Sequence, residues 1–388
     1  MAELSIQALQ IYLTSIHNAL CSYVHIPIEY LIPLIPEETV PLGNIRERVL
    51  ELFDKGEFRH TDVLVLGFYV ALVWVILRYM ITSFVSKPLG RWCMCLEPVN
   101  YEENKILDKE FERSTSKVLS EEHKVLLPAK TNLPLQQIVD YFKAKRMERR
   151  QRQQLHKFTQ SFWELVAYTF LVAWGVYVHH DQPYLTDSMS LWEDFPIQHV
   201  RPCEKLYYVM ELGLYLNFFV YQFLDHRRSD WVEYFVHHSV TLFLLLFSWL
   251  TSFIRVGLVI MIIHDTSDPL LNLAKIFNYT AKKRPRFQIC ADVTFAIFAL
   301  VFFVTRILFY PGYLLKATFI TILEVMVMHP CYYVWNPLMG TLFVLNVLWF
   351  FMICKVIQKA LSGKLDDVRS DDDIDTDEGE GDGKPKKE

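Results

Sequence analysis

The sequence lacks the short motifs that mark many metalloenzymes and hydrolases. Its seven cysteines are irregularly spaced and form neither a zinc-ligand pattern nor a disulfide framework. Two pairs of adjacent histidines, His179-His180 and His237-His238, lie outside any HxxxH or HxxHH box of the kind that membrane di-iron hydroxylases and desaturases use. The GxSxG sequence of serine hydrolases is also missing. We therefore expect no metal site and no bound cofactor.

Charged residues are scarce as well. They make up 21% of the 388 residues, against 52% hydrophobic residues, and the mean hydropathy is positive. A chain this apolar is expected to cross a membrane repeatedly, and to do so with helices, because an open sheet edge leaves backbone groups unpaired in lipid. The expected fold is an all-α integral membrane protein with about seven spans. Windows of about 20 apolar residues place the spans at 63–86, 160–178, 206–224, 234–252, 255–277, 290–310 and 339–360.

The N-terminal segment 1–62 shows no cleavable signal peptide, because a basic region followed by a clean apolar run is missing. Residues 4–35 are apolar, but Pro27 and Pro33 interrupt them. We expect this stretch to lie at the membrane interface rather than to form an eighth span.

The orientation follows from the distribution of Lys and Arg. Residues 140–157 hold seven Lys or Arg against two acids, and the loops 225–230 and 281–287 are also basic. Residues 179–204 hold one Arg and five acids. Basic loops lie on the cytosolic side, so the N-terminus is expected in the lumen and the C-terminus in the cytosol. Cys203 and Cys331 then both lie on the lumenal side, where they either form one bridge or remain unpaired.

The C-terminal segment 363–388 is expected to be a disordered cytosolic tail. Residues 364–388 hold eleven acids and five bases at low sequence complexity. The tail ends in KPKKE, which matches the KxKxx signal for retrieval to the endoplasmic reticulum. Acids occupy the three positions after Ser370, and we predict phosphorylation of this serine by an acid-directed kinase.

Residues 100–157, between the first two spans, are long enough for a small cytosolic fold. The stretch 134–154 predicts a helix with a basic face and resembles the third helix of a homeodomain, with Tyr141-Phe142 as its aromatic pair. Ala144 stands where homeodomains have their base-reading Asn, so DNA binding is not expected. The basic face suits anionic lipid headgroups or a phosphorylated substrate, or it is simply solvated.

The predicted spans 234–252 and 255–277 meet near Phe253 and should form a tight antiparallel hairpin. His237 lies sixteen residues before Phe253, and Asp268 lies fifteen residues after it. At ~1.5 Å per residue both are about 23 Å from the turn, and so on one level near the cytosolic face. Ionisable residues inside a membrane usually mark function, although polar contacts between helices are the alternative. The candidate catalytic residues for general-base or nucleophilic chemistry are His237, His238, Asp265 and Asp268.

Residues 225–279 resemble the Lag motif of ceramide synthases, a branch of the TLC-domain family. The likeness rests on the HH pair, on RVG at 255–257, on HDTSD at 264–268 and on the AKIFNY that follows. It extends over roughly 100–370 and includes the homeobox-like segment, which is typical of the animal type. The resemblance implies a TLC domain over 158–362 and an N-acyltransferase of the endoplasmic reticulum. Such an enzyme joins a fatty acyl-CoA to the amine of a sphingoid base to give (dihydro)ceramide and CoA.

The resemblance also implies partners and further site residues. Acyl-CoA and a long-chain base would be the substrates, membrane lipids would surround the bundle, and homo- or heterodimers are plausible. Glu211 and Arg306 match acidic and basic positions of the family, with either an interhelical or a substrate role. The basic residues expected to meet CoA are Arg149, Arg150, Arg227, Arg228, Lys282, Lys283 and Arg284.

A lumenal loop after the sixth span is expected to close the acyl-chain tunnel and to set the preferred acyl length. Its residues are Thr318, Phe319, Ile320, Thr321, Ile322, Leu323, Glu324, Val325, Met326, Val327 and Met328. Two mechanisms remain open at the histidines, namely direct general-base catalysis and an acyl-imidazole on His237. The alternative for the whole protein is a non-enzymatic lipid sensor or scaffold of the TLC type.

Overall fold

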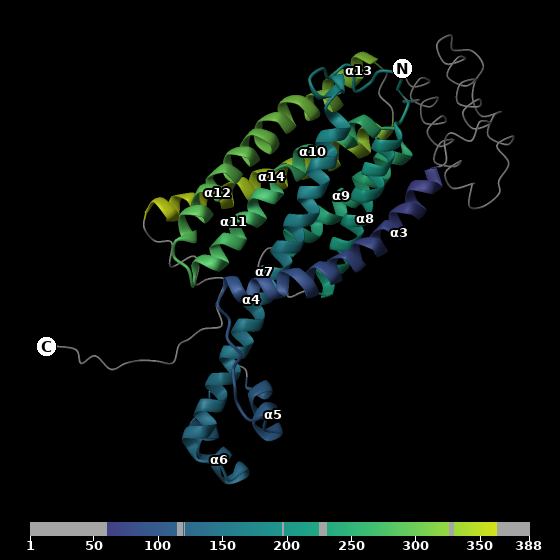
Figure 1. Ribbon diagram of the computed structural model, residues 1–388. Helices are drawn as coiled ribbons and strands as arrows, with labels where there is room; N and C mark the ends of the chain where they lie inside the picture. Colours follow the sequence, from purple (N-terminus) through teal and green to yellow (C-terminus); the bar gives the residue numbers. More distant parts are fainter. Residues whose placement is uncertain are drawn as a thin grey trace.

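The computed structural model describes residues 60–114, 119, 121–195, 198–224, 231–325 and 330–362. Across these ranges the regular structure is helical throughout. Figure 1 shows the long helices gathered in one bundle, with a smaller helical part projecting from one end. Several predictions concern residues outside this part of the chain: most of 1–62, Arg227, Arg228, Met326, Val327, Met328 and the tail 363–388 with Ser370.

The elements, in chain order, are α3 (His60–Met80), η3 (Ile81–Ser86), α4 (Lys87–Cys93), α5 (Lys105–Arg113), α6 (Glu121–Thr131), α7 (Leu135–His179), η4 (Pro183–Leu185), α8 (Pro202–Leu224), α9 (Trp231–Leu250), α10 (Ile254–Asp265), α11 (Asp268–Ala281), α12 (Phe287–Phe302), η5 (Phe303–Leu315), η6 (Ala317–Thr321), α13 (Ile322–Val325) and α14 (Pro330–Leu361). The elements η3, η5 and η6 are π-helical, and η4 is a 3₁₀ turn.

Six helical stretches are long and apolar enough to cross a membrane, which confirms the all-α membrane fold. They are Val65–Cys93, Leu135–His179, Trp231–Leu250, Ile254–Ala281, Phe287–Val325 and Tyr332–Ala360. The remaining predicted span, 206–224, corresponds to α8, which has 23 residues. It is less apolar because Glu211 and Asn217 lie within it, and both are buried inside the bundle. The number of seven spans stays a prediction.

The predicted fifth span is not one continuous helix. It consists of α10 and α11, and Thr266 and Ser267 form a turn between them. Pro269 is the second residue of α11, and a proline has no N–H to continue the hydrogen-bond ladder of α10. His264, Asp265 and Asp268 therefore do not share one helix face, as a continuous span would require. His264 and Asp265 end one helix, whereas Asp268 starts the next.

The predicted selectivity loop is also helical where the structure describes it. Residues from Phe287 to Val325 form one helical stretch, so Thr318–Val325 extends the sixth span instead of folding as a re-entrant or capping loop. The stretch passes Pro311 as a π-helix. Such local adjustment lets a membrane helix accommodate a proline without ending. Whether this segment selects acyl length stays a prediction.

The projecting part, here called the stalk, comprises α5, α6 and the first half of α7. Its small core is formed by Leu107, Phe111, Leu119, Leu127, Ile138, Tyr141 and Phe142. The predicted start of the helix at 134–154 is confirmed, since α7 begins at Leu135. It does not end near residue 154, because α7 runs for 45 residues from the stalk into the bundle (Figure 1).

A partly buried hydrogen bond and an ion pair join α5 to α7 in the stalk. The Oδ1 of Asp108 accepts a hydrogen bond from the Tyr141 hydroxyl at 2.7 Å and lies 2.7 Å from the Lys145 ammonium. The hydrogen bonds from Lys145 and Tyr141 hold the pKa of the Asp108 carboxyl below its usual value. The stalk is therefore held by an ion pair as well as by its apolar core.

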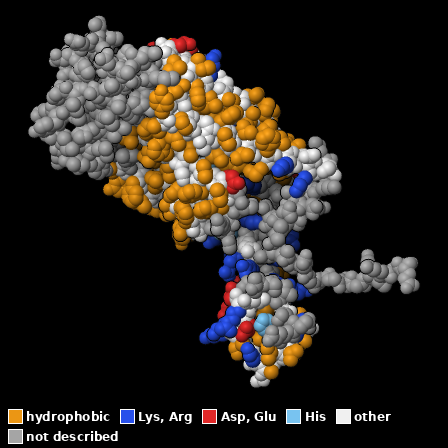
Figure 2. Space-filling model, turned by 180° about the vertical axis from the view of Figure 1, so that it is seen from behind, with side chains coloured by type: hydrophobic (Ala, Val, Ile, Leu, Met, Phe, Trp, Pro, Cys, Tyr) orange, Lys and Arg blue, Asp and Glu red, His pale blue; other side chains and the backbone are white. Residues whose placement is uncertain are grey.

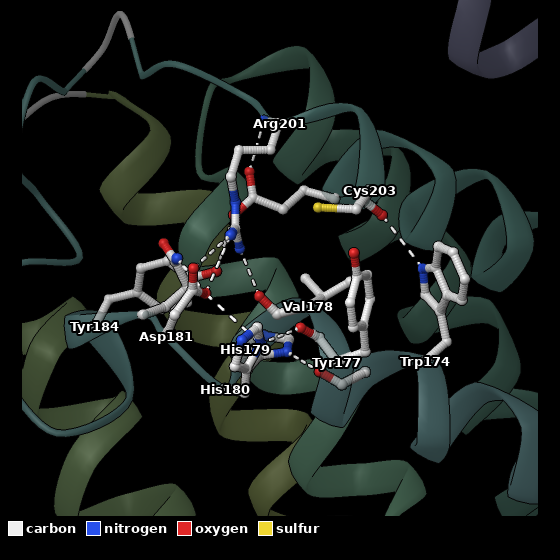
Figure 3. A network of polar contacts seen from close by, with 12 residues as sticks. Trp174, Tyr177, Val178, His179, His180, Asp181, Tyr184, Arg201 and Cys203 are labelled. Carbon is white, nitrogen blue, oxygen red and sulfur yellow. Dashed lines mark hydrogen bonds and ion pairs between the residues drawn. The ribbon is translucent and has the colours of Figure 1, made fainter.

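The connection between α7 and α8 covers the opposite end of the bundle. Arg201 binds Asp181, with 3.1 Å between Nη1 and Oδ1, and lies 3.2 Å from Glu204, as Figure 3 shows for the surrounding network. The hydrogen bond from Gln182 and the charge of Arg201 lower the pKa of the exposed Asp181 carboxyl. Cys203 carries a free thiol in this network.

Candidate active site

Both predicted catalytic histidines line a cavity of about 290 Å³ within the bundle. Asp268 and Arg306 line the same cavity, although α9, α11 and η5 supply them from distant parts of the sequence. Aromatic side chains from α12 and α14, such as Phe298 and Trp349, form apolar walls. The structure thus brings together three of the four predicted catalytic residues.

His238 is oriented by a residue that sequence reasoning missed. Its Nδ1 lies 2.7 Å from the amide oxygen of Gln222 on α8. An amide oxygen only accepts, so Nδ1 carries the proton and Nε2 carries the lone pair. The ring also stacks on Phe218 at a centroid distance of 5.9 Å. His238 is therefore held in the tautomer that can accept a proton at Nε2.

His237 has a different environment. Its Nδ1 is buried and has no hydrogen-bond partner among the residues that the structure describes. The ring packs edge-on against Trp349, with centroids 5.0 Å apart. His237 also lines a second, narrower cavity of about 30 Å³, which reaches Trp335. The imidazole of His237 therefore lines both cavities.

Asp268 forms a buried ion pair with Arg306. The Nη2 of Arg306 is 3.0 Å from Oδ2 of Asp268, and the same nitrogen donates a hydrogen bond to the carbonyl oxygen of His264. Arg306 thus connects the last turn of α10 with the first residue of α11 across the break at Thr266 and Ser267. Of the two roles considered for Arg306, the structure shows the interhelical one.

Asp265 does not line the histidine cavity. It is completely buried, and Glu211 of α8 lies beside it. Both oxygens of each carboxyl lack a hydrogen-bond donor among the described residues. Asp265 and Glu211 are therefore buried acids outside the histidine cavity.

His264 uses both ring nitrogens within the bundle. Nδ1 lies 2.9 Å from the carbonyl oxygen of Ile260 and therefore carries the proton, and Nε2 accepts from the side-chain amide of Asn346 at 3.1 Å. Sequence reasoning missed Asn346, although an amide within the apolar span 339–360 is a usable signal. Gln222 gave no such signal, because it lies near the end of a span.

The predicted CoA-binding residues are scattered. Arg284 donates a hydrogen bond to the Trp92 carbonyl at 3.0 Å, and none of the described members of the set lines the cavity. Its basic lining consists instead of Arg78, Lys275 and Arg306. Figure 2 shows Lys and Arg side chains gathered where the bundle meets the stalk. No three His, Cys, Asp or Glu side chains within the described ranges are arranged to hold a metal ion.

Comparison with known proteins identifies relatives over most of the chain. The TLC domain family matches residues 157–355. Ceramide synthase 5 of Homo sapiens is 32% identical over 299 residues, which cover 76% of this chain and 74% of the relative. Ceramide synthase 4 of Mus musculus is 31% identical and covers 84% of this chain and 83% of its own length. ASC1-like protein 3 of Oryza sativa subsp. japonica is 31% identical over 55% of this chain.

Proposed function

Because the chain belongs to the ceramide synthases of the TLC-domain family, we propose that it transfers the acyl group of a fatty acyl-CoA to the amine of a sphingoid base. The observation that carries this proposal is the cavity that holds His237, His238 and the Asp268–Arg306 ion pair. In the reaction, a C–N bond forms, the thioester C–S bond breaks, and CoA leaves as the thiol. The product is an N-acyl sphingoid base.

The amine must lose a proton before it can attack. A long-chain amine resembles a lysine side chain, with a pKa of ~10, so it is mostly protonated at neutral pH. The Nε2 lone pair of His238, fixed by the bond from Nδ1 to Gln222, is suited to take that proton. The carboxylate of Asp268 in the same cavity favours the imidazolium that results.

His237 offers a second route. Its buried, unpartnered Nδ1 is suited to attack the thioester, to form an acyl-imidazole and to release CoA before the amine binds. A rapid-quench experiment with acyl-CoA alone distinguishes the routes. A burst of one CoA per active site indicates the acyl-enzyme, whereas release of CoA only after addition of the base indicates direct attack.

The substrates fit the two cavities in different ways. Arg78 and Lys275 at the larger cavity suit the phosphates of CoA. The narrower cavity between His237 and Trp335, lined mainly by residues such as Leu244 and Met261, suits the acyl chain. We place the enzyme in the endoplasmic reticulum membrane, with the N-terminus in the lumen and the C-terminus in the cytosol.

An acyl-transfer assay tests the proposed function. Membranes from cells that express the chain should convert sphinganine and a panel of acyl-CoAs to dihydroceramides, measured by mass spectrometry. Membranes that carry the His237→Ala, His238→Ala double variant at equal abundance are the control. Equal product from both preparations would contradict the proposal.

A further inference from the structure

The cavity contains a second acid that the mechanism above does not use. Glu164, on α7, lines the cavity together with Asp268. The two acids differ in their partners. Asp268 is paired with Arg306 at 3.0 Å, whereas Oε1 of Glu164 accepts a hydrogen bond from the neutral amide of Gln160 at 3.0 Å. Within the described part of the chain, no cation lies within ion-pair distance of Glu164.

The cations of the cavity are engaged elsewhere. Arg306 bonds to Asp268, and the guanidinium of Arg78 lies over the ring of Tyr221, 3.6 Å from its centroid. Lys275 acts electrostatically on Asp268. Among the residues that the structure describes, Glu164 therefore presents its carboxylate to the cavity without an ion-pair partner. A carboxylate in a membrane helix is costly unless it faces a cation or a polar cavity, so such a residue indicates a site for a cationic ligand.

The proposed reaction brings one cationic group into this cavity. The sphingoid base enters as an ammonium, and its hydrocarbon chain needs an apolar wall. Phe295, Phe298 and Phe302 of α12 provide that wall on the same cavity that Glu164, His237 and His238 line. The second substrate, acyl-CoA, is anionic at its head, so its phosphates suit Arg78 and Lys275 of this cavity and offer no cation to Glu164.

We propose that Glu164 binds the ammonium group of the long-chain base and positions it beside the two histidines. The proposal rests on the proposed function, because it assigns one of the two substrates of that reaction to a place in the cavity. Glu164 takes no proton in this assignment. It holds the cation until a histidine deprotonates it, and Gln160 orients its carboxylate.

The first test is a kinetic comparison of full-length wild-type protein with Glu164→Gln in membranes. The substitution keeps the shape and removes the charge. We expect the KM for sphinganine to rise about tenfold, as for the loss of one partly buried charge pair, while kcat and the KM for acyl-CoA stay within about twofold. Glu164→Asp should restore part of the affinity. The matched control is Glu233→Gln on α9, a half-buried acid that does not line the cavity.

The second test separates charge recognition from binding of the hydrocarbon chain. Octadecylamine and octadecanol have the same chain, but only the amine is a cation at neutral pH. Glu164→Gln should weaken competitive inhibition by octadecylamine about tenfold and leave inhibition by octadecanol unchanged. An unchanged KM for sphinganine, or equal weakening of both inhibitors, would overturn the assignment. A wild-type protein that forms no amide would instead refute the proposed function.

Discussion

The two adjacent histidines differ in what holds them. Gln222 fixes the tautomer of His238, whereas Nδ1 of His237 is buried without a partner. We expect His237→Ala and His238→Ala each to lower the rate of acyl transfer by about 10²–10⁴, the usual effect of removing an acid–base or nucleophilic group. Product formation per unit of protein measures this. His180→Ala, at an exposed ring in the α7–α8 connection, should retain wild-type activity, and wild-type rates in both site variants would refute the assignment.

The two predicted aspartates should differ as well. Asp268→Asn removes a charge from the cavity and leaves the buried guanidinium of Arg306 without its carboxylate partner. The rate of acyl transfer should fall, and the free energy of unfolding should fall by about 3–5 kcal/mol. Asp265→Asn should have the smaller effect on rate, because Asp265 faces Glu211 instead of the cavity. Initial rates and melting temperatures in detergent measure the two effects.

A double variant separates the two effects of Asp268. Asp268→Asn with Arg306→Met removes both charges of the pair, so it should recover much of the melting temperature without recovering activity. Recovery of activity would show that Asp268 acts only through folding. The position of Asp268 near the histidines could be predicted from its distance to Phe253, but its pairing with Arg306 could not. That contact depends on how η5 packs against the break between α10 and α11.

At the scale of elements, α8 and α10 approach each other closely at Gly257. A Cβ at this position would lie 1.8 Å from the hydroxyl oxygen of Tyr208. That hydroxyl bonds to Ser248 at 3.1 Å and to the carbonyl of Ile254 at 3.0 Å, so it cannot move without loss of these contacts. Gly257→Ala should therefore destabilise the bundle by about 1–3 kcal/mol and lower its melting temperature in detergent.

The control for this substitution is Gly340→Ala on α14, where an added Cβ would meet no atom within 4 Å. Equal melting temperatures for the two variants would show that α8 and α10 do not pack as described. The RVG sequence at 255–257 marked this glycine as part of a motif, but only the packing of Tyr208 explains the need for it.

The segment Thr318–Val325 has an inner and an outer face because it is helical. Thr318, Thr321 and Ile322 are buried, whereas Ile320 and Leu323 are exposed. We expect bulkier residues on the inner face, such as Thr321→Leu, to shorten the preferred acyl chain, with about tenfold discrimination for two methylenes at ~0.8 kcal/mol each. Matched substitutions at Ile320 and Leu323 should not change the profile. Product profiles from mixed acyl-CoAs measure both, and identical profiles in all variants would exclude a role for this segment.

At the scale of the whole molecule, the spans and the hairpin at Phe253 could be predicted because apolar length and charge pattern are local properties. Two features could not. Pro269 is a signal for a helix break, but the apolar residues around it favoured one continuous span. The chain stays helical through Pro311 because it adopts π-helical geometry, which the sequence does not reveal. Tyr141 and Phe142, the aromatic pair of the homeodomain resemblance, lie in the core of the stalk. The continuity of α7 between stalk and bundle was missed, because the basic segment resembled a domain of its own.

The attachment of α5 to this continuous helix should depend on pH. Folding lowers the pKa of the Asp108 carboxyl through its contacts with Lys145 and Tyr141, so the ionised form is favoured in the folded stalk. The stabilisation is fully present above the unfolded pKa of ~3.9 and is lost as the pH falls through the lower folded value.

Hydrogen exchange in α5, corrected for intrinsic rates, should therefore show a loss of protection below about pH 4 in the wild-type protein. Asp108→Asn should be less protected at pH 7 and should lack this acid-dependent step, whereas Asp140→Asn, whose carboxylate bonds to Gln136 on its own helix, should behave like the wild type. An acid step that persists in Asp108→Asn would show that another group anchors the stalk.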